Sequence, residues 1–275
     1  MIEFHSVFKN YPDGTQAVSD FSLQIPPRQT TVFVGSSGCG KTTLLRMINR
    51  MVEPSGGMLS IDGTDISTRD AVQLRRSIGY VMQNAGLLPH FTVEQNISTV
   101  PRLQGQTRRS ARKRSLELME TVGLDTSMAD RYPHQLSGGQ QQRVGVARAL
   151  AADPNILLMD EPFGAVDPIV RAELQEELLR LQRELDKTVV FVTHDIDEAF
   201  LLGDQVVILA AGAQKLQVGS PSSIIEKPAN DFVSSFIGAE RGARALSIKH
   251  TPDGTVLVDQ QGRTQGRLIQ DEQTL

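Results

Sequence analysis

One eight-residue stretch, Gly-Ser-Ser-Gly-Cys-Gly-Lys-Thr at positions 35–42, constrains the possible fold more than any other part of this chain. It fits G-x-x-x-x-G-K-[ST], a glycine-rich loop that follows a strand and opens a helix. The apolar run 31–34 supplies the strand, so strand, loop and helix occur in the required order. Such a loop directs backbone N–H groups and a helix dipole at phosphate oxygens. A chance glycine-rich loop is the alternative, and the ordered context argues against it.

The residue types in this loop predict distinct roles. Lys41 is expected to bridge the β- and γ-phosphates of a nucleotide, and Thr42 to place its hydroxyl on Mg²⁺. The residues expected to surround the nucleotide are Gly35, Ser36, Ser37, Gly38, Cys39, Gly40, Lys41, Thr42 and Thr43.

The hydrophobic pattern predicts an α/β core. Continuous apolar runs, separated mostly by helical patterns, are typical of parallel strands covered on both faces. They occupy 31–34, 156–159, 189–193 and 206–209. Near the N-terminus, the near-alternating segment 18–25 and the turn signals Asp13-Gly14 and Asp62-Gly63 predict a small antiparallel layer instead.

Helix signals replace strand signals between Gln83 and Asp153. Thr92 with Gln95, and Ser137 with Gln140, fit the capping box at a helix start. We therefore expect a helical subdomain at about 85–153, inserted into the α/β core. Asp167-Pro168 predicts the start of the next helix, with an N-cap aspartate and proline at the first helical position.

Composition excludes several classes of protein. A net charge of -4 and a pI near 5.8 argue against binding nucleic acid through backbone neutralisation. No apolar run approaches the ~20 residues that cross a bilayer, and the N-terminus lacks a signal-peptide pattern. Any membrane span is expected to come from other subunits. The single cysteine fits a reducing compartment.

Two further motifs give the sequence a family resemblance. Leu-Ser-Gly-Gly-Gln lies at 136–140, and the apolar strand 156–159 ends in Asp160 and Glu161. Together with the phosphate loop they resemble the ATPase subunit of an ABC transporter. The resemblance implies a P-loop NTPase fold with a RecA-like core, an antiparallel β layer and the inserted helical subdomain. It covers the expected ATPase domain, 1–238.

The resemblance also implies a composite site in a homodimer. In that family this segment of one subunit closes over the ATP that the phosphate loop of the other holds. Ser137, Gly138, Gly139 and Gln140 are therefore expected to contact the partner's nucleotide.

Polar residues at the strand ends are expected to complete the site. A buried carboxylate at Asp160 needs a cation, and Mg²⁺ is the expected one. Glu161 is placed to polarise the attacking water. By resemblance, Gln83 contacts Mg²⁺ and the water, and His194 contacts the γ-phosphate. Taken singly, Gln83 would be a surface residue, and His194 a structural or solvated one.

Two more residues are assigned by resemblance. Asp167 matches an aspartate of the family's dimer-interface loop. Gly164 and Val166 differ from the commoner motif of that loop, Ser-Ala-Leu-Asp. A plain helix N-cap is the other interpretation of Asp167. Tyr11 occupies the position of an aromatic ring stacked on adenine, and is equally interpretable as a turn residue before Pro12.

Three longer stretches of the sequence indicate one branch of the family. The stretches 83–90, 161–168 and 191–199 look like those of ATPases from quaternary-amine importers, which take up glycine betaine, choline or carnitine. This implies two membrane permease subunits, an extracytoplasmic substrate-binding protein and a peripheral place at the cytoplasmic face of the inner membrane. Leu87 and Leu88 are expected to receive a helix of the membrane subunit, or else to pack inside the helical subdomain.

The remaining segments carry weaker signals. Residues 239–275 form a short accessory tail, too short for a pair of regulatory CBS modules. Segments 255–259 and 267–269, with a turn at Gln261-Gly262, could form a hairpin like a fragment of one module. A short accessory hairpin or a poorly ordered terminus is the alternative. The basic run 108–114 is expected to be a solvated helix start, with membrane-surface attraction as the alternative.

Other functions remain as alternatives at this point. Uptake of another small solute fits the same motifs. A non-transport ABC ATPase acting on nucleic acid is disfavoured by the single cassette, the single cysteine and the lack of sustained heptads. A catalytically inactive regulator is disfavoured because Lys41, Asp160, Glu161 and His194 are all present.

Overall fold

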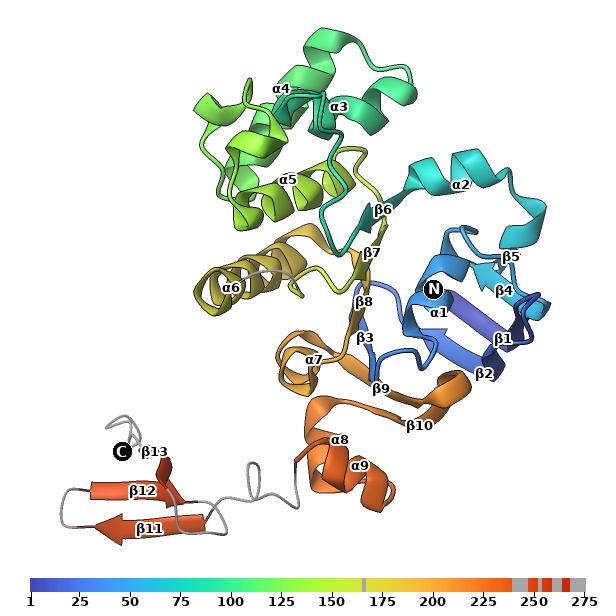
Figure 1. Ribbon diagram of the computed structural model, residues 1–275, viewed down its shortest axis with the longest axis vertical. Helices are drawn as coiled ribbons and strands as arrows, with labels where there is room; N and C mark the ends of the chain where they lie inside the picture. The colour runs from blue at the N-terminus through green and yellow to red at the C-terminus, as the bar shows by residue number, and fades with distance from the viewer. Residues whose placement is uncertain (165–166, 239–246, 252–253, 259–263, 268–275) are drawn as a thin grey trace.

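A central sheet with helices on one side and a second sheet on the other organises the chain (Figure 1). The computed structural model describes residues 1–164, 167–238, 247–251, 254–258 and 264–267. The central sheet has the strand order β10-β9-β3-β8-β7-β6, in which β10 is antiparallel and the others run parallel. Its strands are β3 (Thr30–Gly35), β6 (Ile78–Val81), β7 (Ile156–Asp160), β8 (Thr188–Thr193), β9 (Gln205–Ala210) and β10 (Gln214–Gly219).

The parallel strands are buried on both faces, which explains their continuous apolar runs. Val32 and Val34 of β3 pack in the cluster beneath the helices, whereas Phe33 between them packs on the opposite face. The helices on the first face include α5 (Gly138–Leu150), α6 (Pro168–Leu185) and α7 (Ile196–Leu202), whereas α1 (Lys41–Ile48) packs on the other face. The predicted α/β core is confirmed.

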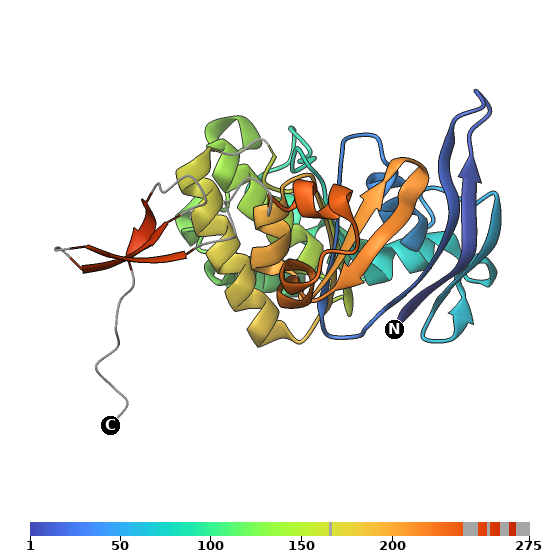
Figure 2. The same ribbon diagram turned by 90° about the horizontal axis from the view of Figure 1, so that it is seen from below.

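The predicted antiparallel layer covers the α1 side of the central sheet, at the far right in Figure 2. Its order is β2-β1-β4-β5. The strands are β1 (Ile2–Asn10), β2 (Gln16–Ile25), β4 (Gly56–Ile61) and β5 (Thr64–Asp65). The ring of Phe21 in β2 meets that of Phe33 in β3 edge to face across this interface, with centroids 6.0 Å apart, and Phe4 of β1 packs edge to face on Phe21 at 5.2 Å. These contacts tie the layer to β3.

Helices replace strands between β6 and β7, as the inserted subdomain requires. After α2 (Ala71–Ser77) and β6 come α3 (Val93–Leu103), α4 (Arg108–Thr121) and α5. Capping boxes form at Thr92 with Gln95 and at Ser137 with Gln140, as predicted. The basic run opens α4, where Arg112 pairs with Asp130. The boundaries 85–153 stay a prediction.

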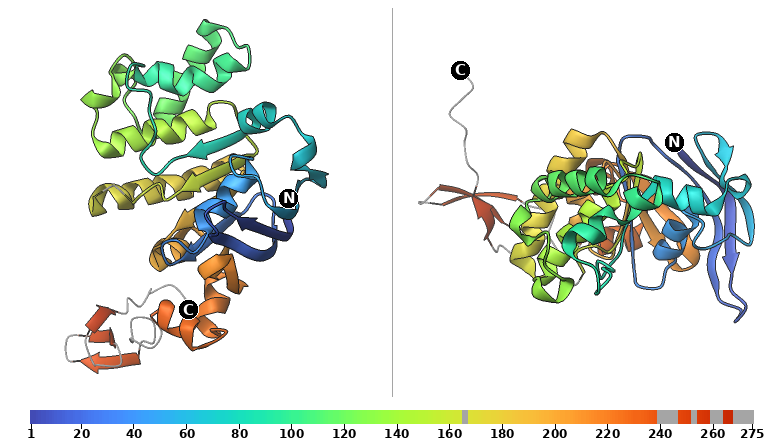
Figure 3. Two further views of the ribbon diagram at one scale, coloured as in Figure 1. Left: turned by 45° about the vertical axis from the view of Figure 1, so that its right-hand side comes forward. Right: turned by 90° about the horizontal axis from the view of Figure 1, so that it is seen from above.

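The chain ends in short elements. Helices α8 (Pro221–Glu226) and α9 (Asp231–Phe236) lie at the end of the molecule opposite α3 and α4 (Figure 3). A small sheet follows, with the order β11-β12-β13 and the strands β11 (Ser247–Thr251), β12 (Gly254–Val258) and β13 (Thr264–Arg267). The hairpin of β12 and β13 is confirmed, but β11 was not expected. The predicted turn at 261–262 and the strand end at 268–269 lie outside the described residues.

None of the helices within these described ranges is both long and apolar enough to span a membrane.

Candidate functional site

The phosphate loop joins β3 to α1, and neighbouring strands require glycine at two of its positions. A Cβ on Gly35 would lie 2.2 Å from the carbonyl oxygen of Leu209. Gly40, at the N-cap of α1, has a φ of 109°, and its Cβ would lie 2.4 Å from the carbonyl oxygen of Ala17. Without side chains at these two positions, the loop can lie close to β9 and β2, and its backbone stays open to phosphate.

Lys41 lies inside the curve of the loop. Its ammonium donates to the carbonyl oxygens of Gly35 at 2.8 Å and Ser36 at 2.9 Å, and the residue is only 4% exposed. The tip of the loop, Ser36 to Gly38, is exposed, Cys39 is buried and Thr43 is half-buried. The loop therefore presents its backbone to solvent with a fixed positive charge behind it.

Asp160 joins β7 to the phosphate-loop helix. Its Oδ1 accepts a hydrogen bond from Thr42 Oγ1 at 2.8 Å. Its Oδ2 accepts from Tyr80 Oη at 2.9 Å and from Arg46 Nη2 at 3.3 Å. The chain itself therefore supplies one cation, Arg46, and two hydroxyl donors to Asp160, and the Mg²⁺ role of Asp160 stays a prediction.

The partners of Asp160 stay protonated at neutral pH. Burial raises the pKa of Tyr80 to about 12, and the hydrogen bond to Tyr80 raises the pKa of Arg46. Tyr80 therefore remains a donor to Asp160 Oδ2, and Arg46 remains a cation beside it.

The oxygens of Thr42 and Asp160 fit a magnesium site. Mg²⁺ prefers hard oxygen ligands, and in nucleotide sites it takes one or two carboxylates, with phosphate and water oxygens completing its shell. The 2.8 Å pair of Thr42 Oγ1 and Asp160 Oδ1 offers that combination next to the phosphate loop. Elsewhere in the described part of the chain, no cluster of three or more His, Cys, Asp or Glu side chains could hold a metal.

Glu161 and His194 form a second pair beside Asp160. Glu161 Oε2 lies 3.1 Å from His194 Nδ1. The backbone of Glu161 is in the left-handed region, with a φ of 46°, and its N–H donates to Val192 of β8. Such strained backbone in a non-glycine residue is concentrated at functional sites. The side chain of Gln83 is exposed and lies beside Gly164, whose Cβ would be 3.5 Å from Gln83 Nε2 and 3.8 Å from Glu161 Oε2.

Parallel strands explain why these residues meet. Strands β3, β8, β7 and β6 are neighbours in that order, and all run in one direction. Their carboxyl ends therefore share one edge, where Gly35, His194, Glu161 and Gln83 follow in turn. Phosphate loop, carboxylates, histidine and glutamine lie along that edge.

The 136–140 segment lies in the helical subdomain. Ser137 is the exposed N-cap of α5, and its Oγ accepts from the N–H of Gln140 at 3.2 Å. Gly138 is exposed, whereas Gly139 is buried, and its Cβ would lie 2.4 Å from Val170 Cγ1 of α6. This segment therefore presents a helix N-terminus to the surface, fixed against α6.

Asp167 and Tyr11 have local partners. Asp167 caps α6 through the N–H groups of Ile169 at 3.1 Å and Val170 at 3.2 Å, so the N-cap interpretation is confirmed. The adjoining Ala165 and Val166 lie outside the described residues. Tyr11 is half-buried in a turn closed by the N–H of Gly14, and Lys9 Nζ lies 5.3 Å from its ring centroid. These partners leave the interface and adenine roles as predictions.

Sequence reasoning missed the partners of Asp160. Arg46 lies four residues after Thr42 on α1, a spacing that puts both side chains on one helix face. That spacing was a usable signal. Tyr80 reaches Asp160 from β6, and only the adjacency of β6 and β7 reveals it.

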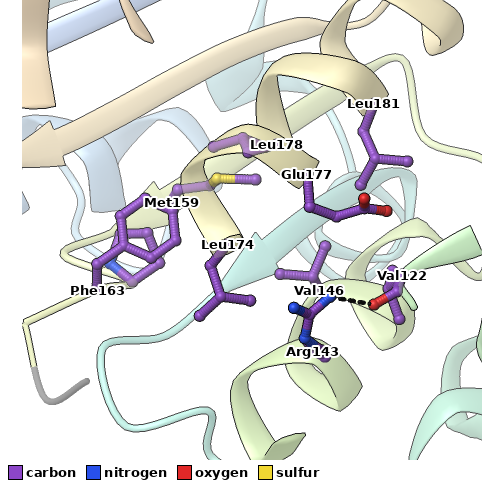
Figure 4. Close-up of a pocket in the computed structure, with 10 residues that line it drawn as sticks. Val122, Arg143, Val146, Met159, Phe163, Leu174, Glu177, Leu178 and Leu181 are labelled. Carbon is purple, nitrogen blue, oxygen red and sulfur yellow. Dashed lines mark hydrogen bonds between the residues drawn. The ribbon is translucent and has the colours of Figure 1, made fainter. Parts of the chain in front are cut away.

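A small apolar cavity lies behind the Glu161 loop (Figure 4). It has a volume of about 20 Å³, and the apolar part of its lining comes from β7, the loop after β7, α5 and α6: Met159, Phe163, Val146, Leu174 and Leu178. Phe163 is 3% exposed, and its ring centroid lies 5.7 Å from that of Phe191. Phe163 therefore anchors the loop that carries Glu161.

We expect Phe163→Ala to destabilise the fold by about 3–5 kcal/mol, because it enlarges an existing cavity. Chemical denaturation of the purified protein measures this free energy of unfolding. The control Val72→Ala removes an exposed apolar side chain from α2 and should change stability by about 0.5 kcal/mol or less. Equal stability of Phe163→Ala and the parent would show that the loop is not anchored here.

Comparisons with known proteins agree with this geometry. A family model described as ABC transporter matches residues 18–164. The choline transport ATP-binding protein OpuBA of Bacillus subtilis (strain 168) is 50% identical over the whole chain, which spans 71% of that relative. The glycine betaine/carnitine/choline transport ATP-binding protein OpuCA of the same strain is 54% identical over 88% of the chain, which spans 63% of that relative.

Solved structures agree as well. A structure described as the dimeric post-hydrolysis state of the ATP-binding cassette MJ0796, bound to ADP and Pi, has a TM-score of 0.73 and 34% identity. The alignment covers 80% of this chain and 99% of that one. From these matches and the phosphate-loop geometry, the chain belongs to the ABC transporter family and is one of its ATP-binding, ATP-hydrolysing proteins.

Proposed function

We propose that the chain hydrolyses MgATP in a head-to-tail homodimer and thereby powers uptake of a quaternary-amine osmoprotectant. The observation that carries the proposal is the meeting of Lys41, the Thr42–Asp160 pair and the Glu161–His194 pair at one sheet edge. Catalysis of phosphoryl transfer is mainly positioning and charge stabilisation, and these groups supply both.

Each group has a role that follows from its position. Lys41 and the loop N–H groups bind the phosphates, and Glu161 accepts a hydrogen bond from the attacking water. His194, held by Glu161, contacts the γ-phosphate. Thr42, Asp160 and Gln83 would hold Mg²⁺, which neutralises phosphate charge when bound.

Two chains are needed for a complete site in this proposal. Ser137 Oγ accepts a hydrogen bond within its own capping box, which leaves its O–H group to donate to a phosphate oxygen. An exposed N-terminus of the 13-residue helix α5 favours an anion there. The dimeric description of the ADP-bound cassette supports the same arrangement.

The transport role rests on the relatives. The name of OpuBA specifies choline transport, and the name of OpuCA specifies glycine betaine, carnitine and choline transport. We propose that this chain serves two membrane permease subunits, fed by an extracytoplasmic substrate-binding protein, from the cytoplasmic face of the membrane. The solute does not meet this subunit, so its class follows from the relatives alone.

Uptake measurements test the proposed function. A strain lacking this gene should lose uptake of at least one of labelled glycine betaine, choline and carnitine at raised osmolarity. The wild-type gene should restore uptake, whereas Glu161→Gln should not. Unchanged uptake of all three solutes, with an active purified ATPase, would show that the system imports another small solute.

An exposed groove on α3 offers a place for the membrane subunit. It is lined by Leu88, Phe91, Gln95, Ser98, Thr99 and Leu103, with Leu88 36% and Leu103 55% exposed. Asn96 holds the backbone of Leu88 from both sides, through its Oδ1 at 2.8 Å and its Nδ2 at 3.1 Å. Leu87 behaves differently, because it packs against the main core. The structure therefore separates the two leucines that the sequence grouped together.

We expect Leu88→Ser to reduce uptake at least about tenfold, because it removes an apolar contact from the centre of an interface. ATPase activity and melting temperature of the isolated subunit should stay at parent values. The matched variant Leu87→Ser should instead lower the melting temperature, since it places a hydroxyl against the core. Reconstituted uptake, ATPase and melting are measured on both. Parallel losses of all three in Leu88→Ser would refute docking at this groove.

A further inference from the structure

A buried carboxylate, that of Glu198, lies beside the Glu161–His194 pair. Glu198 lies in the first turn of α7 and is 7% exposed. Burial raises the pKa of its carboxyl group. A buried acidic group is costly unless its oxygens are hydrogen-bonded, and both oxygens of Glu198 have partners.

The first oxygen holds the turn that carries His194. Glu198 Oε2 accepts from Thr193 Oγ1 at 2.6 Å. The same Thr193 oxygen accepts from the N–H of Asp195 at 3.0 Å. Asp195 Oδ1 in turn accepts from the N–H of Glu198 at 3.4 Å. Both neighbours of His194 are therefore fixed to each other and to Glu198.

The second oxygen faces α6. Glu198 Oε1 accepts from Gln175 Nε2 at 3.3 Å and lies 3.9 Å from Arg171 Nε. Arg171 belongs to the first turn of α6, and its N–H donates to the carbonyl of Asp167 at 2.9 Å. The carboxylate thus bridges the start of α6, which Asp167 caps, and the turn that presents His194.

A small polar cavity joins this bridge to the reaction centre. Glu161, His194, Thr193, Arg171 and Glu198 all line it, and its volume of about 30 Å³ has room for a water molecule. His194 Nδ1 lies 3.1 Å from Glu161 Oε2, and both residues line this cavity. One hydrogen-bonded residue, Thr193, therefore separates Glu198 from His194.

We propose that Glu198 is a positioning residue for His194, which links the start of α6 to the turn that aims the imidazole at the γ-phosphate. The proposal rests on the proposed function of His194 and deepens it. Because Asp167 lies at the other end of this link, the position of α6 at the dimer interface sets the position of His194.

The test is a double-mutant cycle in ATP hydrolysis. Glu198→Ala should lower kcat about tenfold to a hundredfold, the effect of misplacing a group by about 1 Å, with ATP affinity held within about twofold. In a His194→Ala background the same change should cost no further rate, measured by single-turnover hydrolysis. If Glu198 acts only by stabilising the fold, Glu198→Ala would lower the hydrolysis rate by the same factor in the parent and in the His194→Ala background.

Further variants distinguish the loss of a single hydrogen bond from misfolding of the protein. Glu198→Gln should lose less kcat than Glu198→Ala, because its amide oxygen still accepts from Thr193 although its NH₂ group cannot accept from Gln175. Thr193→Val should reproduce the loss of kcat, because it removes the same hydrogen bond from the other side. Asp197→Ala, on the exposed side of the same turn, is the control and should match the parent in kcat and melting temperature.

The outcomes separate this inference from the proposed function. Equal losses in the parent and His194→Ala backgrounds would overturn the positioning role while leaving the ATPase account intact. A normal rate in His194→Ala itself would overturn it as well. A parent protein without ATP hydrolysis would instead contradict the proposed function.

Discussion

Replacing Glu161 with glutamine should slow ATP turnover about 10²- to 10⁴-fold while leaving ATP binding intact, the range typical for loss of a general base. The amide is nearly isosteric, so Lys41 and the phosphate loop keep their geometry. It is a weaker acceptor than the carboxylate, and its hydrogen bond to water no longer draws the proton away. ATP should therefore accumulate uncleaved between two subunits.

Phosphate release and size-exclusion chromatography measure these two effects. With ATP, Glu161→Gln should elute as a dimer, whereas without nucleotide it should elute as a monomer. Glu120→Gln makes the same chemical change at an exposed position of α4 and should match the parent in both assays. Near-parental phosphate release from Glu161→Gln would remove Glu161 from the role of water-activating group.

The sequence predicts the core of the site because local patterns encode it. The phosphate loop, the buried strands and the N-caps at Thr92, Ser137 and Asp167 each depend on residues within a few positions of one another. Their geometry therefore follows from short segments read one at a time.

The parts that the sequence did not predict depend on packing between distant elements. Tyr80 reaches Asp160 only because β6 pairs with β7, and Glu198 meets Gln175 only because α7 packs beside α6. No local pattern encodes such neighbours. The cost of burying Asp160 pointed to a cation, but not to Arg46 as that cation.

Two surface features show the same limit. Strand β11, Ser-Ile-Lys-His-Thr, has one large apolar residue, Ile248, which is 61% exposed, so no alternating pattern marks it. Leu87 and Leu88 are adjacent and chemically identical. Only the tertiary structure shows that Leu87 packs against the core and Leu88 opens on the groove.

Ser137→Arg is the second variant with a large expected effect. A long cation at the N-cap of α5 blocks the approach of the partner's nucleotide, and hydrolysis should fall to background. ATP binding by the isolated subunit should persist, since its own phosphate loop is unchanged. Loss of the cap also costs about 1 kcal/mol. Thr107→Arg, at the exposed N-cap of α4, incurs the same loss and should hydrolyse ATP normally.

Mixing variants tests directly whether two chains share each site. Subunits with Ser137→Arg and subunits with Lys41→Ala should both be inactive alone. Their heterodimer keeps one site with both intact halves, so an equal mixture should recover up to about one quarter of the parent rate. The opposite mixture combines parent subunits with subunits that carry both substitutions. In that heterodimer each site has one damaged half, so it should be inactive.

Steady-state ATPase rates across mixing ratios of these two pairs test most directly whether two chains share each ATP site. We expect recovery when the two substitutions are on different chains, and suppression of the parent when they are on the same chain. The reverse pattern, with no recovery in the first mixture and an undiminished rate per parent chain in the second, would mean that each chain completes its own site. That result would contradict the composite ATPase proposed here.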